Sequence, residues 1–191
     1  MKNIYILLFA LVIGLVSCVD DDMYPNADQP QPEEPDQPEE PVAIDYSVII
    51  LNELDGNQKF IELYNSGETD IDLSGCYIEK DEEKNWTANG ITLKAGEYLL
   101  LWGEDAVAEG EDHEGYDAKL VFNSGLSAKK DVKIELFDPN GESISKFDLT
   151  KEDDRDEENS YSRNADKLWY YATPTPGTAN IDGTTKVLTV N

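Results

Sequence analysis

Residues 132–149 read VKIELFDPNGESISKFDL, and they carry the strongest secondary-structure signal in the chain. In the first six residues, Val, Ile and Leu alternate with Lys and Glu, which places the apolar side chains on one face of a β-strand. The Asp-Pro-Asn-Gly of residues 138–141 then predicts a tight turn, because proline fixes φ at about −65° and glycine tolerates positive φ. Residues 143–149 are expected to pair back, so this stretch predicts a β-hairpin.

Short apolar or alternating runs separated by turn residues continue on the N-terminal side of this hairpin. They cover residues 47–51, 59–64, 76–78, 91–93 and 97–102. Turn signals recur about every ten residues, which is typical of a sandwich or barrel. The run at 97–102 is so apolar that we expect a strand buried on both faces. Residues 106–109 predict at most one turn of helix. The sequence therefore predicts an all-β domain over residues 44–191.

Several motifs follow one another in a recognisable order along residues 46–180. They are Ile49-Ile50-Leu51-Asn52-Glu53, Phe60-Ile61-Glu62-Leu63-Tyr64-Asn65, Asp72-Leu73-Ser74-Gly75, Leu93-Lys94-Ala95-Gly96-Glu97-Tyr98, the hairpin, Ser160-Tyr161-Ser162-Arg163, Trp169, and Thr173-Pro174-Thr175-Pro176-Gly177-Thr178-Ala179-Asn180. This order resembles the lamin tail domain family, and residues 173–180 are its most specific piece. The resemblance implies an immunoglobulin-like β-sandwich. Cys76 departs from the family pattern, because many bacterial members carry an aromatic residue there, and this implies altered core packing.

Most motif residues are expected to be structural. Asn65 and Gly75 suit turns that need left-handed backbone geometry. Pro174 and Pro176 cannot donate ladder hydrogen bonds, so their segment is expected to end the last strand. The family-motif residues in this group are Glu53, Glu62, Asn65, Gly75, Pro174, Pro176, Gly177 and Asn180.

Glu53 and Glu62 are the two motif carboxylates with a chemical alternative. They are expected on strands that neighbour each other. Two such carboxylates could form an acid/base pair or a metal site. Alternatively, they cap loops and accept backbone N–H bonds, as acidic residues often do at turns.

The chain of 191 residues has 41 Asp and Glu against 15 Lys and Arg, a formal net charge of −26. Binding to nucleic acid needs clustered Lys and Arg, so this balance excludes nucleic acid as a partner. It also excludes binding to an anionic membrane through a polybasic patch. Residues 18–43 hold nine acids and no base, and residues 44–191 hold 32 acids and 14 bases. The domain itself therefore carries a net charge of −18.

Residues 1–17 read as a secretory signal. A short head with Lys2 precedes an apolar run over residues 4–16, which is too short to cross a hydrocarbon core of about 30 Å. Leu15-Val16-Ser17-Cys18 resembles the lipobox of bacterial lipoproteins. This resemblance implies that the Cys18 sulfur takes a diacylglycerol before cleavage on its N-terminal side. We therefore expect a lipid-anchored protein of the bacterial outer membrane.

Residues 18–43 read as a tether between the lipid and the domain. Asp20, Asp21 and Asp22 resemble the acidic export tag of some surface lipoproteins, although they could simply begin the linker. Six of the nine prolines follow, among repelling carboxylates and with almost no aliphatic residues. Such a segment cannot bury a core and favours extended polyproline II. We expect a disordered stalk and exposure at the cell surface.

The sequence offers little catalytic chemistry, so we expect no enzyme. His113 is the only histidine, and no nucleophile elbow, P-loop or dinucleotide fingerprint is present. Cys18 is assigned to the lipid, which leaves Cys76 as a lone thiol in a predicted strand. Cys76 is expected to be a small buried residue rather than a nucleophile.

Two acidic loops, at residues 104–117 and 152–158, raise the question of calcium. Calcium takes oxygen ligands, but neither loop fits an EF-hand. A solvated loop is the alternative to a specific site. The calcium candidates are Asp153, Asp154, Asp156, Glu157 and Glu158.

These observations favour a non-catalytic adhesion or binding module whose partner is an unknown protein or glycan. A binding module is expected to expose an aromatic patch. The alternatives are a calcium-binding structural surface protein, and an accessory domain to an exported nuclease, phosphatase or glycan-processing hydrolase. The aromatic residues considered for the patch are Trp86, Trp102, Trp169 and Tyr170.

Overall fold

The computed structural model describes residues 43–108, 117–123, 125–150, 155–181 and 187–190. The predicted signal, Cys18, the acidic tag, almost all of the predicted tether and His113 lie outside these ranges. Asp153 and Asp154 lie outside them as well. No helix within the described ranges is long and apolar enough to cross a membrane.

The described chain is built almost entirely of strands. Its three short helices are η1 (Tyr46–Val48), α1 (Glu104–Ala108) and η2 (Ala118–Leu120). The strands are β1 (Ile49–Asp55), β2 (Phe60–Asn65), β3 (Ile71–Asp72), β4 (Tyr77–Lys80), β5 (Glu83–Thr87), β6 (Thr92–Leu93), β7 (Tyr98–Gly103), β8 (Val121–Phe122), β9 (Val132–Phe137), β10 (Ser143–Leu149), β11 (Ser160–Arg163) and β12 (Trp169–Ala172).

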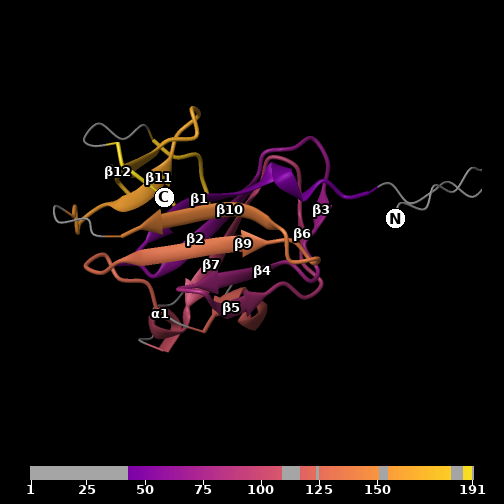
Figure 1. Cartoon of the computed structure of the whole chain (residues 1–191), viewed down its shortest axis with the longest axis horizontal. Helices are drawn as coiled ribbons and strands as arrows, with labels where there is room; N and C mark the ends of the chain where they lie inside the picture. Colours follow the sequence, from indigo (N-terminus) through magenta and orange to yellow (C-terminus); the bar gives the residue numbers. More distant parts are fainter. Residues whose placement is uncertain (1–42, 109–116, 124, 151–154, 182–186, 191) are drawn as a thin grey trace, which may run out of the picture. The chain divides into compact units, whose positions relative to one another are not determined.

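Two sheets form the layers of an immunoglobulin-like β-sandwich (Figure 1). One has six strands in the order β12-β11-β1-β2-β7-β8, and the other has four in the order β10-β9-β4-β5. Every pairing in them is antiparallel except that of β7 with β8. The pair β3-β6 forms a third, small sheet. These findings confirm the predicted fold class.

The core lies between the two larger sheets. Phe147 of β10 contacts the rings of Tyr161 and Trp169 on the other sheet, with centroids 5.0 and 4.7 Å apart. The sheets are also joined by a hydrogen bond, in which the Leu51 N–H donates to Ser145 Oγ at 3.1 Å. Aromatic burial of this kind is a large favourable term in folding.

The predicted hairpin of residues 132–149 is confirmed. β9 and β10 pair along their whole length, with a register shift between Ser143 and Ser145. Gly141 adopts a φ of 87°, which favours glycine. Asp138 Oδ1 accepts the N–H of Asn140 and of Glu142, each at 2.8 Å, so the aspartate side chain holds the turn.

Several local expectations are corrected. Tyr46–Val48 forms a 3-10 helix, so the first strand begins at Ile49 rather than at 47. The strand at 98–103 is buried on one face only, because Tyr98, Leu100 and Trp102 are half-buried. Edge strand β5 carries mainly polar residues and gave no sequence signal; its pairing with β4 is a tertiary contact.

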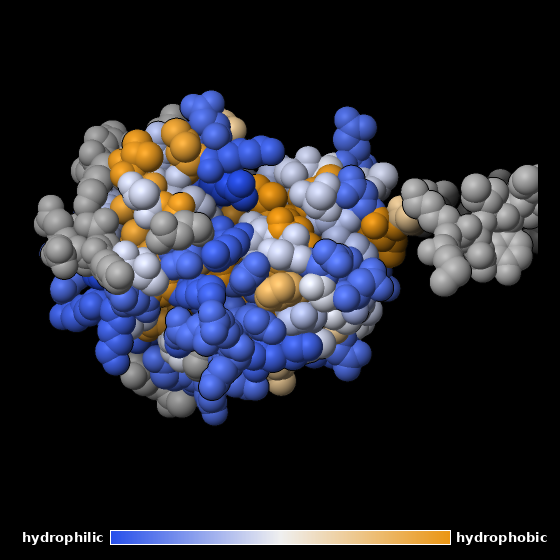
Figure 2. All heavy atoms as spheres, in the orientation of Figure 1, coloured by the Kyte–Doolittle hydropathy of each residue, from blue (hydrophilic) through white to orange (hydrophobic). Residues whose placement is uncertain are grey.

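Figure 2 shows that the visible face is largely hydrophilic over β9, β4 and β5. Apolar surface gathers beside β11 and β12, where Leu168 and Val187 are exposed. Most acidic side chains of the described residues therefore lie at the surface, whereas Glu53, Asp55 and Glu62 are buried.

Candidate functional site

The outer face of the six-stranded sheet carries the two motif carboxylates. Glu53 of β1 and Glu62 of β2 are register partners, and both are fully buried. Their strand neighbours Leu54 and Ile61 belong to the apolar core. Because side chains alternate along a strand, the two glutamates point away from that core, towards whatever covers the outer face.

Residues 173–180 supply that cover. The Thr175 N–H donates to both carboxylate oxygens of Glu53, at 3.1 and 3.2 Å, and Thr175 Oγ1 donates to Oε2 at 3.2 Å. The Gly177 N–H donates to Glu62 Oε2 at 2.6 Å. Gly177 has a φ of 76°, so its backbone conformation favours glycine. The two glutamates therefore anchor the segment that follows β12.

Two serines on β11 complete the surroundings of Glu53. The hydroxyls of Ser160 and Ser162 both donate to Glu53 Oε1, the latter at 3.1 Å. Ser160 Oγ also lies 2.9 Å from the carbonyl oxygen of Ala172 and 2.9 Å from Ser162 Oγ. The carboxylate thus links β1, β11 and residues 173–177.

An asparagine pair extends this network. Asn52 Nδ2 donates to Glu62 Oε1 at 2.7 Å and to Asn180 Oδ1 at 3.2 Å. Asn180 Nδ2 donates to the carbonyl oxygens of Asn52, at 2.9 Å, and Arg163, at 2.8 Å. Asn180 therefore ties the end of the covering segment to β1 and β11.

Burial raises the pKa of both carboxyl groups. For Glu53 the upward shift from burial exceeds the downward shift from its hydrogen bonds to Ser160, Thr175 and Ser162. For Glu62, burial together with the nearby Glu53 charge raises the pKa to about 7, against the lowering effect of Asn52 and Gly177. All four carboxylate oxygens accept hydrogen bonds from protein groups. Of the alternatives for this pair, the geometry supports loop anchoring.

The remaining motif residues also hold turns. Asn65 is fully buried, and its Nδ2 donates to the carbonyl oxygens of Thr69, at 2.9 Å, and Leu93, at 3.0 Å. Gly75 has a φ of 88°. Pro174 and Pro176 lie in the covering segment directly after β12, as expected from their missing N–H groups.

A pocket of about 380 Å³ lies beside this network. It combines residues from β1, β2 and β7 with the loop between β11 and β12 and the end of the covering segment. The lining residues that bear on its chemistry are Asn52, Tyr64, Tyr98, Arg163, Lys167 and Asn180.

One wall of the pocket is aromatic. Tyr64 and Tyr98 are register partners on β2 and β7, and their rings stack with centroids 4.7 Å apart and an interplanar angle of 24°. Burial raises the pKa of Tyr98, so its hydroxyl stays protonated at neutral pH. The pair presents amphipathic surface, apolar on the rings and polar at the hydroxyls.

Two basic residues, Arg163 and Lys167, also line the pocket. The Arg163 side chain is partly buried, and its Nε has no hydrogen-bond partner within the described part of the chain. Burial lowers the pKa of its guanidinium, yet arginine stays charged at neutral pH. Lys167 lines the same pocket, and none of the lining residues is acidic. This is an unusual composition on a domain with 32 acids and 14 bases.

The aromatic residues expected to form a patch do not form one. Trp86 and Trp169 are core residues, and Trp86 Nε1 donates to the Lys119 carbonyl oxygen at 2.8 Å. Trp102 is half-buried and packs edge-on against Phe60, with centroids 5.7 Å apart. Tyr170 is half-buried on β12 and bridges to Val187. The expectation was wrong because Trp86 and Trp169 fill the core and the other two side chains are half-buried.

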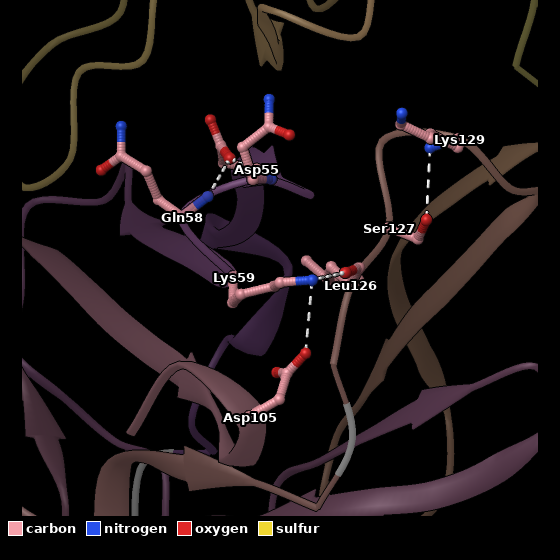
Figure 3. Close-up of polar contacts among 8 residues, drawn as sticks. Asp55, Gln58, Lys59, Asp105, Leu126, Ser127 and Lys129 are labelled. Carbon is pink, nitrogen blue, oxygen red and sulfur yellow. Dashed lines mark hydrogen bonds and ion pairs between the residues drawn. The ribbon is translucent and has the colours of Figure 1, made fainter. Parts of the chain in front are cut away.

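A second polar cluster lies at the β1–β2 turn (Figure 3). Lys59 Nζ donates to the Leu126 carbonyl oxygen at 2.9 Å and forms an ion pair with Asp105 at 3.3 Å. Asp55 Oδ1 accepts the N–H groups of Asn57 and Gln58, each at 2.6 Å. These bonds hold the turn against α1 and residues 125–128. They also hold Lys59 in its left-handed backbone conformation, with a φ of 64°.

Two of the three described calcium candidates, Asp156 and Glu157, use their carboxylates to bind protein groups. Asp156 Oδ2 accepts from Asn159 Nδ2 at 2.7 Å, and its Oδ1 accepts the Glu158 N–H at 3.2 Å. Glu157 forms an ion pair with Lys129 at 3.1 Å. Within the ranges that the structure describes, no three His, Cys, Asp or Glu side chains gather as a metal site would require.

Sequence reasoning identified the anchoring glutamates and Asn180 but missed the pocket. Tyr64, Tyr98 and Arg163 occur within the family motifs, so each was noticed only as part of a pattern. The usable signal was Arg163, one of only two arginines in a very acidic chain.

Comparison with known proteins identifies the family. A family model described as Lamin Tail Domain matches residues 43–151, which is more than half of the chain. No curated protein matches the sequence. Residues 173–180 lie beyond the matched range, but the two glutamates that anchor them lie within it. The chain belongs to the lamin tail domain family.

Proposed function

We propose that this protein is a non-catalytic binding module, anchored by lipid on Cys18 and presented at the surface of a bacterial outer membrane. The single observation that supports binding is the pocket formed by Tyr64, Tyr98 and Arg163. It is concave, has aromatic and cationic walls, and is built on sheet strands and an anchored loop. Rigid elements of this kind hold a binding site in a constant geometry.

The anchor rests on the sequence of residues 15–22. A lipobox that ends in Cys18 is followed directly by Asp20, Asp21 and Asp22. Two or three acyl chains anchor a protein stably, since each buried CH₂ contributes about 0.8 kcal/mol. The acidic, proline-rich tether then holds the sandwich away from the membrane.

A non-catalytic role agrees with how the buried carboxylates are used. Glu53 and Glu62 are enclosed and accept hydrogen bonds from the segment that covers them. A general acid or base has to reach its substrate, and these two groups face protein donors instead. The partner is a protein or a glycan, because a net charge of −26 disfavours nucleic acid.

Binding is tested with the full chain carrying Cys18→Ala, screened against a glycan array and a peptide array. Tyr98→Ala removes one ring of the pocket pair and should abolish any specific signal. Tyr77→Ala is the matched control, because Tyr77 and Phe137 form a similar stacked pair within the four-stranded sheet, with centroids 4.9 Å apart. Equal loss in both variants, or no ligand on either array, would contradict the proposal.

Anchoring is tested by fractionation of bacteria that express the chain. Cys18→Ala should release the protein from membranes, and protease added to intact cells should cleave the wild type. Replacing Asp20, Asp21 and Asp22 together by Asn should protect the protein from that protease while leaving it in the membrane fraction. Retention of the Cys18→Ala protein in membranes would overturn lipid anchoring.

A further inference from the structure

We infer that the Tyr64–Tyr98–Arg163 pocket binds an acidic saccharide, whose carboxylate or sulfate group pairs with Arg163 while a sugar ring packs on the tyrosines. This inference rests on the proposed binding function and assigns the chemical class of its ligand.

The charge of the pocket selects an anion. Arg163 forms no ion pair with any residue of the described ranges, and burial is the one cause that shifts its pKa. An Arg fork that lacks a carboxylate partner is suited to bidentate binding of a carboxylate or sulfate. All the residues lining the pocket are basic or neutral, so an anion meets no acidic side chain there.

The hairpin loop that carries the two cations is held rigidly. The Leu168 N–H donates to Asn164 Oδ1 at 2.9 Å, and the Lys167 N–H donates to the Asn164 carbonyl oxygen at 2.9 Å. Asn180 Nδ2 fixes the Arg163 carbonyl oxygen at 2.8 Å. Lys167 adopts a φ of 64°, which sets its position in the turn. Arg163 and Lys167 are thus placed before a ligand arrives, which lowers the entropic cost of binding.

The neutral groups of the pocket suit hydroxyl-rich ligands. Ser66 Oγ donates to the Val48 carbonyl oxygen at 2.8 Å, and Ser47 Oγ donates to Asp45 at 2.6 Å. Each hydroxyl oxygen therefore keeps acceptor capacity for an O–H of the ligand. Asn164 lines the pocket beside them. Short polar side chains at the rim match the alternating hydroxyls of a sugar better than they match an apolar ligand.

The aromatic wall favours a sugar ring over an acidic peptide. The faces of aromatic rings are negatively polarised and attract the C–H groups of a pyranose. Tyr64 and Tyr98 stack on each other with centroids 4.7 Å apart, so each ring covers one face of the other and a sugar would pack on an outer face of the pair. A volume of about 380 Å³ suits a short saccharide and falls in the usual range of small-ligand pockets.

The test is calorimetric titration of the full chain carrying Cys18→Ala. The probes are trigalacturonate, its methyl ester as the uncharged control, a sulfated lactose, and an oligoglutamate peptide of equal charge. We expect trigalacturonate or sulfated lactose to bind, and the methyl ester to bind at least about tenfold more weakly, because it lacks the charge-assisted hydrogen bonds. Comparison of the two acidic sugars identifies which anion is preferred.

The variants assign the binding to the pocket. Arg163→Gln should weaken binding by about tenfold to a hundredfold, and Arg163→Lys should restore part of it. Lys167→Gln, at an exposed turn position, should weaken binding without affecting the fold. Lys129→Gln is the control, because it removes the same charge from an exposed residue near the β1–β2 turn, at the other end of these strands. Equal effects of Lys129→Gln and Lys167→Gln would overturn the inference.

The remaining outcomes separate this inference from the proposed function. Preferential binding of the oligoglutamate would overturn the saccharide assignment, and preferential binding of the methyl ester would overturn the requirement for an acidic group. The binding function would then stand if that binding is lost in Tyr98→Ala. Absence of Tyr98-dependent binding to every probe and to both arrays would overturn both.

Discussion

Glu53 and Glu62 lie opposite each other on neighbouring antiparallel strands, and each accepts a backbone N–H from the segment that follows the last strand of the sheet. Two like charges in a buried, adjacent position are costly unless donors surround them. Here one donor is Asn52 of β1 and the others come from residues 160–177, so the pair links the N-terminal strands to the C-terminal end of the domain. This linkage also sets one side of the pocket, because Asn180 belongs to the anchored segment.

Replacing Glu53 by Gln should detach that anchor. The amide would put an N–H group among the donors Ser160, Ser162 and Thr175, which leaves buried groups unpaired. We expect a loss of about 2–4 kcal/mol in the free energy of unfolding, measured by urea denaturation. The exchange rate of the Thr175 amide should rise.

Glu135→Gln is the matched control for this change. Its carboxylate also accepts a serine hydroxyl, from Ser143 at 2.6 Å, but at an exposed site. That substitution should cost less than about 0.5 kcal/mol. Equal effects of the two substitutions would show that Glu53 has no special role as an anchor.

The raised pKa of Glu62 makes stability depend on pH. Because its folded-state pKa of about 7 exceeds the ordinary value of 4.5, the folded protein binds more protons than the unfolded chain between those values. The contribution of this group is therefore complete below pH 4.5 and is lost as pH rises through 7. Glu53, whose pKa is also raised, acts in the same direction.

The Glu62→Gln variant separates the pH-dependent contribution of Glu62 to the free energy of unfolding from the contributions of the many surface acids. The amide does not titrate, so the wild type should lose more stability than the variant between pH 5 and pH 8. The expected difference is about 2–3 kcal/mol, measured as the change in unfolding free energy with pH. Parallel curves for the two proteins would contradict the assignment.

Gly56 is required by close backbone packing. A Cβ at this position would lie 2.7 Å from the Cα of Ala128, against backbone that cannot move as a side chain would. Gly56→Ala should therefore destabilise the domain by about 2–3 kcal/mol, measured by thermal or urea unfolding.

Gly90 provides the control for this change. It has a φ of 65°, and a Cβ added to it would meet nothing within 4 Å; asparagine tolerates that conformation. Gly90→Asn should cost well under half as much, although its side chain is larger.

Cys76 should be chemically inert in the folded protein. It is buried, and burial raises its pKa to about 12, so almost no thiolate forms at pH 8. In the Cys18→Ala chain, a maleimide should label Cys76 only after denaturant is added. Fast labelling under native conditions would show that the thiol is accessible.

Calcium is tested by thermal unfolding. Asp156 and Glu157 are already engaged with Asn159 and Lys129. A solvated acidic loop responds to divalent charge in general, so millimolar calcium should raise the melting temperature by no more than magnesium does. A larger shift in calcium, lost in Asp153→Asn with Asp154→Asn, would establish a specific site at residues 152–158.

The local pattern of the sequence was sufficient for the fold class. The alternation in residues 132–137, the Asp-Pro-Asn-Gly turn and the order of motifs predicted a hairpin within an immunoglobulin-like sandwich, and the structure has both. These signals depend on neighbours in the chain, because side-chain alternation and turn geometry are set within a few residues. The same reasoning failed for β5, whose polar sequence becomes a strand only by pairing with β4.

The pocket was decided by tertiary structure alone. Tyr64 and Tyr98 are 34 positions apart and meet because β2 pairs with β7, while Arg163 reaches them through the hairpin of β11 and β12. Trp86 and Trp169, which the sequence offered as surface aromatics, fill the core instead. The sequence by itself determined the acidic composition and the strand pattern, and it predicts the targeting signal and the tether. Which aromatic rings line the pocket, and which arginine has no carboxylate partner among the described residues, depended on how distant strands pair, since pairing brings together residues that carry no local signal of one another.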